Sequence, residues 1–133
     1  MRHLLDTNVV IGLLDDARGP ALYARVAAEP PGSVVTSVVV AHELYFGAAR
    51  SPRRAHNERR LEVLFRDLQV LPLTREDAEA AGDIRAALRA AGTPIGPYDV
   101  LIAGQARARG LIVVTRNIRE FRRVEGLVVE DWL

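Results

Sequence analysis

The sequence predicts an α/β protein with a central parallel β-sheet of four to five strands, layered between helices on its two faces. Three observations support this fold class. Short apolar segments are separated by longer segments with helical periodicity. The short segments are apolar at consecutive positions, as expected for strands of a parallel sheet that is covered on both faces. The length of 133 residues suits one domain with a sizeable core, and we expect a single domain over residues 1–133.

Four segments fit buried strands, and a fifth is a weaker candidate. Each is short, rich in Val, Ile or Leu, and bounded by polar residues, Gly or Pro. In chain order they are RHLLD at 2–6, SVVTS at 33–37, VLPL at 70–73, GLIVVT at 110–115 and the weaker candidate GLVVEDW at 126–132.

Six segments between these strands fit helices. Ser37 and the pair Thr74 and Asp77 stand where N-terminal caps are expected. Pro20 suits a first helical turn, and Gly92 ends a pattern that keeps every third or fourth residue apolar. The predicted helices cover residues 7–16, 20–29, 38–49, 53–68, 74–91 and 98–109.

Composition excludes several kinds of protein. The formal net charge is only +1, so no global positive field indicates a nucleic-acid partner. All 18 basic residues are Arg, which excludes a P-loop, a Schiff base and a receiver domain, because each needs a Lys. The absence of Cys excludes disulfides and thiolate zinc sites. No segment resembles a membrane span or a signal peptide, and we expect a cytoplasmic protein.

Polar side chains follow three of the predicted strands, at residues 6–8, 36–37 and 115–117. The carboxyl ends of parallel strands lie along one edge of a sheet, where ligands bind in such folds. Two further acids should face this edge. Glu43 shares a helical stripe with Val39, Val40 and Phe46, and Asp99 lies in the first turn of its helix.

Each acid also has a structural explanation. Asp6 fits a helix cap, Asp99 complements a helix dipole, and Glu43 could pair with an Arg. Together, however, converging carboxylates repel one another unless a cation lies among them. Oxygen ligands without Cys or converging His suit Mg²⁺, or Mn²⁺ as a substitute, rather than zinc. His42 and Glu43 begin an HExxH motif, but Phe46 stands where the second His is required.

Four motifs in a fixed order then identify a family. They are LLDTN at the start, a helical Glu followed by L-Y-x-G, IGPYDVLIAG, and V-T-x-N-x-x-E-F. With this set, residues 2–132 resemble a PIN-domain ribonuclease of the VapC type, the toxin of a VapBC toxin–antitoxin system. The resemblance implies a PIN-like three-layer α/β/α fold and a toxic Mg²⁺-dependent endoribonuclease.

The resemblance also implies roles for individual residues. The acid cluster is Asp6, Glu43 and Asp99, of which Asp6 and Asp99 are the expected primary metal ligands. Asn117 stands where the family often has a fourth acid, with Glu120 as the nearest carboxylate. Further candidates are Thr7 and Asn8, which position Asp6 and contact RNA, Arg116 for an RNA phosphate, and Thr115 as a secondary site residue.

The expected partners are RNA, a second copy of the chain in a homodimer, and a VapB-type antitoxin. In this family the C-terminal segment of the antitoxin enters the active-site groove. Two other functions remain open from the residues: a PIN fold that binds RNA without cleaving it, and a DNA nuclease related to flap endonucleases. The three intact acids disfavour the first, and the absence of DNA-clamping elements disfavours the second.

Overall fold

A five-stranded, all-parallel sheet organises the computed structural model, which describes residues 1–133. The strand order is β3-β2-β1-β4-β5, and every neighbouring pair is parallel. The strands are β1 (His3–Leu5), β2 (Val34–Ser37), β3 (Gln69–Leu71), β4 (Ile112–Val114) and β5 (Val129–Glu130). The predicted α/β class and parallel sheet are therefore confirmed.

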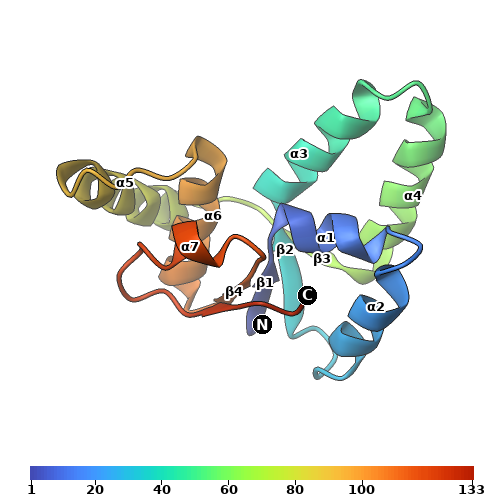
Figure 1. The fold of residues 1–133 in the computed structure, drawn as a ribbon, viewed down its shortest axis with the longest axis horizontal. Helices are drawn as coiled ribbons and strands as arrows, with labels where there is room; N and C mark the ends of the chain where they lie inside the picture. The colour runs from blue at the N-terminus through green and yellow to red at the C-terminus, as the bar shows by residue number, and fades with distance from the viewer.

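Seven helices accompany the sheet. In Figure 1, α1 to α4 lie on one side of the strands and α5 to α7 on the other. Their bounds are α1 (Thr7–Leu13), α2 (Gly19–Ala27), α3 (Val38–Ala49), α4 (Arg54–Asp67), α5 (Arg75–Ala90), α6 (Pro97–Arg109) and α7 (Ile118–Phe121). None of these helices is long and apolar enough to cross a membrane.

The predicted caps form as expected. The Ser37 hydroxyl accepts a hydrogen bond from the Val39 amide at the start of α3. Thr74 and Asp77 make the reciprocal bonds of a capping box at the start of α5. These local bonds satisfy amide groups that have no partner inside their own helix.

One predicted helix is corrected, and one further helix was not predicted. Helix α1 ends at Leu13, not at residue 16, because the Asp15 carboxylate accepts bonds from the Ala17 and Arg18 amides and so favours a turn. The four-residue α7 was not predicted, since it is shorter than the window in which helical periodicity can be recognised.

The register of β1 aligns the strand ends that carry the polar residues. Leu5 pairs with Thr36 of β2 on one side and with Val114 of β4 on the other. The residues that follow β1 and β4 are Asp6 and Thr115, and both are buried at this edge. The sheet therefore brings the first and the last predicted site segments together.

Candidate active site

Asp6 lies at the carboxyl end of β1 and caps α1. Only 4% of its surface is exposed. One carboxylate oxygen accepts the Thr7 amide at 2.7 Å, and the other accepts the Thr115 hydroxyl at 2.7 Å. Burial raises the pKa of Asp6 above its usual value, although these two hydrogen bonds act in the opposite direction. Asp6 is thus both a helix cap and a buried acid at the ligand-binding edge of the sheet.

Glu43 reaches the same edge from α3. Its Oε1 accepts the Thr7 hydroxyl at 2.9 Å, so Thr7 connects Glu43 to the segment that carries Asp6. Val39 and Val40 are buried beside it as predicted, but Phe46 is 59% exposed. The prediction that Phe46 shares this buried face is wrong, because the second half of α3 extends away from the sheet (Figure 1).

Asp99 and Glu120 share a hydrogen bond between their carboxyl groups. Asp99 lies in the first turn of α6, and Glu120 lies in α7. Burial raises the pKa of Asp99 to about 7, and the bond to Glu120 and the negative charges of Asp6, Glu120 and Glu43 add to the shift. The same bond lowers the pKa of Glu120. The contact between the two carboxyl groups thus favours the protonated form of Asp99 and the charged form of Glu120.

Asn117 contacts the acids through Glu120. Its side-chain amide donates to Glu120 Oε2 at 2.9 Å, and its backbone amide donates to the Thr115 hydroxyl at 2.9 Å. The geometry thus favours Glu120 over Asn117 as the fourth acid. The family motif puts the fourth acid at position 117, which is why the sequence ranked Glu120 second. Glu120 follows Asn117 by three residues, or one helical turn, and α7 and the bond between the two side chains agree with that spacing.

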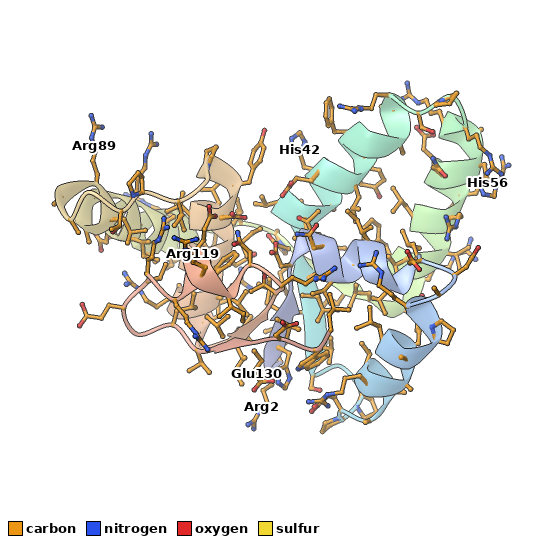
Figure 2. The ribbon with its side chains drawn as sticks, in the orientation of Figure 1. Arg2, His42, His56, Arg89, Arg119 and Glu130 are labelled. Carbon is orange, nitrogen blue, oxygen red and sulfur yellow. The ribbon has the colours of Figure 1, made fainter.

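The basic residues near the site make no hydrogen bond to its acids. Arg116 and Asn8 are exposed and make no side-chain hydrogen bond. Arg123 donates to the Pro94 carbonyl at 2.9 Å and lowers the pKa of Glu120. Arg119, labelled in Figure 2, lies on α7, the helix that also carries Glu120.

The donor set suits a hard divalent cation. Asp6, Glu43, Asp99 and Glu120 offer carboxylate oxygens, and none takes part in an ion pair with Arg or His. The side chains do not form a ready-made cage, since no three of them converge on one point. Instead, Thr7 holds Glu43 and Thr115 holds Asp6 by hydrogen bonds.

Comparison with known proteins points to one family. The PIN domain model matches residues 3–127. The chain is 39% identical over 132 residues to the tRNA(fMet)-specific endonuclease VapC of Shigella flexneri, covering 99% of this chain and 98% of that protein. It is 35% identical over 133 residues to ribonuclease VapC2 of Haemophilus influenzae strain KW20, covering 100% of this chain and 99% of that protein.

Solved structures agree with this similarity. The VapBC crystal structure from Salmonella typhimurium, bound to DNA, contains a chain that superposes with a TM-score of 0.94 at 37% identity. That match covers 100% of this chain and 99% of the other. A VapBC2 chain from Rickettsia felis superposes with a TM-score of 0.93 at 27% identity, and both chains are covered completely.

Proposed function

Since the chain belongs to the PIN-domain family of VapC ribonuclease toxins, we propose that it cleaves RNA in a Mg²⁺-dependent reaction at Asp6, Glu43, Asp99 and Glu120. One observation carries this proposal. Carboxylates from four separate segments face the ligand-binding edge of the sheet, and none of them forms an ion pair with a basic residue. Residues 1–133 act as one catalytic domain in this proposal.

The carboxylates of Asp6, Asp99 and Glu120 would hold the ion directly. Glu43 would lie beside the ion without binding it directly. Mg²⁺ bound there would polarise the phosphodiester and lower the pKa of a water molecule. Mn²⁺ would substitute, because both ions prefer oxygen ligands. Asp99 would hold the ion in its charged form, since a carboxylate ligand must be deprotonated.

The polar neighbours position these acids. Thr115 fixes Asp6, Thr7 fixes Glu43, and Asn117 fixes Glu120 by the hydrogen bonds described above. Side chains that support metal ligands in this way affect affinity and activity. The exposed Arg116 and Asn8 are available for the phosphates of the RNA strand.

The initiator tRNA is the first substrate to test. The relatives from Shigella flexneri and Salmonella typhimurium are both named tRNA(fMet)-specific endonucleases, at 39% and 37% identity. The nuclease would act in the cytoplasm, where its RNA substrate and its antitoxin are made.

A groove supports the expected VapB-type antitoxin. A hollow of about 220 Å³ between α1, α3 and α4 begins at Glu43 and reaches Arg60. It shares Leu14 and Arg60 with a cleft of about 630 Å³ that extends to Tyr23. We propose that an antitoxin segment follows this path and inserts a basic side chain among the acids, where a carboxylate contact replaces the metal. We also propose that two copies of the nuclease form a homodimer.

Expression in a bacterial host tests the proposed function. The chain alone should arrest growth and fragment RNA, and the antitoxin encoded beside it should relieve the arrest. The matched control is Asp6→Asn, which keeps the shape of the side chain but removes its charge and should not arrest growth. Normal growth with abundant, folded wild-type protein would favour the RNA-binding alternative without cleavage.

A further inference from the structure

Two aromatic rings contact each other between α3 and α6. His42 directly precedes Glu43 in α3, and Tyr98 directly precedes Asp99 in α6. Their ring centroids are 5.5 Å apart, and the ring planes are inclined by 62°. Figure 2 shows His42 on the side of α3 that faces α6. The rings thus connect the two helices that carry Glu43 and Asp99.

Core packing does not explain this pair. Tyr98 is 45% exposed and His42 is also exposed. Neither belongs to the hydrophobic core, and neither side chain makes a hydrogen bond. Tyr23, Tyr45 and Phe46 are exposed as well, and Tyr98 differs from them in directly preceding an acid of the site.

We propose that His42 and Tyr98 form a stacking site for one base of the RNA, next to the phosphate that is cleaved. This inference rests on the proposed function. The contact between the rings joins the parts of α3 and α6 that carry Glu43 and Asp99, so an RNA strand with a phosphate at these acids passes close to the rings. Every base has a flat π-face, and stacking on an aromatic side chain therefore tolerates different sequences.

Stacking also offsets the electrostatic repulsion between this site and RNA. The four carboxylates repel the phosphates of an approaching strand. Stacking of a base does not depend on the charge of the phosphate, so it adds affinity where the acids reduce it. The rings would then hold the strand in register with Asp99 and Glu43, which makes them substrate-positioning residues.

A second copy of the chain is the competing occupant. Val38 and Phe46 lie four residues on either side of His42 and are 40% and 59% exposed, so this face of α3 could pack against another protein molecule. The position of Tyr98 favours RNA, because it comes from a different helix and borders Asp99 directly. The oligomeric state of each variant separates the two possibilities.

The first experiment measures cleavage of an initiator tRNA transcript by the wild type and four variants. Tyr98→Ala should lower kcat/KM about 5- to 150-fold, the range expected for loss of one stacked base, mainly through a higher KM. Tyr98→Phe should keep near wild-type activity because it keeps the ring. His42→Ala should have a smaller effect. Tyr45→Ala is the matched control, since Tyr45 is 50% exposed on the same α3 but packs against Phe65.

The second experiment removes single bases from the RNA around the mapped cleavage position. One abasic substitution should impair the wild type as much as Tyr98→Ala does, and combining the two changes should cost no more than either alone. Fully additive losses at every position would overturn the inference, as would wild-type kinetics of Tyr98→Ala. A Tyr98→Ala variant that also changes its oligomeric state would identify the pair as a contact between copies. Failure of the wild type itself to cleave would instead contradict the proposed function.

Discussion

At the residue scale, the hydroxyl of Thr115 is the clearest example of a side chain that acts through another. It is fully buried and donates to Asp6 at 2.7 Å while accepting the Asn117 amide at 2.9 Å. The hydroxyl therefore links the first acid of the site to the segment that leads to Glu120. Its position at the end of β4 follows from the register with β1.

Thr115→Val should reduce RNA cleavage about 10- to 100-fold, as expected for loss of a group that supports a metal ligand. Val keeps the branched shape but cannot donate to Asp6. Thr115→Ser is the control and should recover most of the activity, because it restores the donor. Steady-state cleavage rates across a Mg²⁺ titration give the comparison, and equal rates for Val and Ser would exclude the role of the hydroxyl.

A second prediction at this scale is that Glu120 contributes more to cleavage than Asn117. Glu120→Gln should lower cleavage more than Asn117→Ala, because the first removes a proposed ligand and the second removes only the bond that orients it. We expect a loss of more than about 100-fold for the first and about 10- to 100-fold for the second. If Asn117→Ala is the more damaging change, Asn117 itself faces the ion, as the motif alone suggested.

At the element scale, α5 and α6 pack closely enough to leave no room for a Cβ at Gly104. A methyl group there would lie 2.6 Å from the Cα, Cβ and backbone nitrogen of Ala81. This packing fixes α6, and the first turn of α6 carries Asp99. The packing of α6 against α5 thus fixes the position of Asp99, although Asp99 lies more than one turn away from Gly104.

Gly104→Ala should destabilise the protein by about 1–3 kcal/mol, because the added methyl group forces the two helices apart. Gly82→Ala on α5 is the matched control. No atom lies within 4 Å of a Cβ at this exposed position, so the change should stabilise the helix by up to about 1 kcal/mol. Urea unfolding of both variants tests the pair, and a neutral Gly104→Ala would show that the helices are less closely packed than described.

Sequence reasoning was most successful where elements have a strong local signature. The strand that ends at Asp6 and the capping box of Thr74 were recognised because apolar runs and caps are encoded within a few residues. Helix α7 was missed because four residues are too few to show a period. The contact between His42 and Tyr98 joins residues far apart in the chain, and no local pattern encodes it.

At the scale of the whole molecule, the crowded carboxyl groups should make stability depend on pH. Burial raises the pKa of Asp99 to about 7, and the pKa of Asp6 is also raised. The folded chain therefore binds more protons than the unfolded chain between about pH 4 and pH 7, so these groups lower the stability as pH rises through that window. The lowered pKa of His56 acts in the opposite direction.

A single substitution isolates the contribution of Asp99 to the pH dependence of stability. Asp99→Asn imitates the protonated carboxyl group at every pH and leaves His56 unchanged. Its melting temperature without metal should match the wild type near pH 5 and exceed it at pH 8, by about 3–8 °C. Added Mg²⁺ should raise the melting temperature of the wild type but not of the variant. Parallel melting curves for the two proteins from pH 5 to pH 8 would contradict the raised pKa.

The central claim is that the four acids form a metal site that cleaves RNA, and the most direct test is the metal dependence of cleavage in the purified protein. Initiator tRNA and total RNA are incubated with the wild type, Asp6→Asn and Asp99→Asn, in EDTA and across a range of Mg²⁺ concentrations. We predict no cleavage in EDTA, restored cleavage by the wild type in Mg²⁺, and a loss of more than about 100-fold in each folded variant. Full cleavage in EDTA, or wild-type rates in either variant, would contradict the claim.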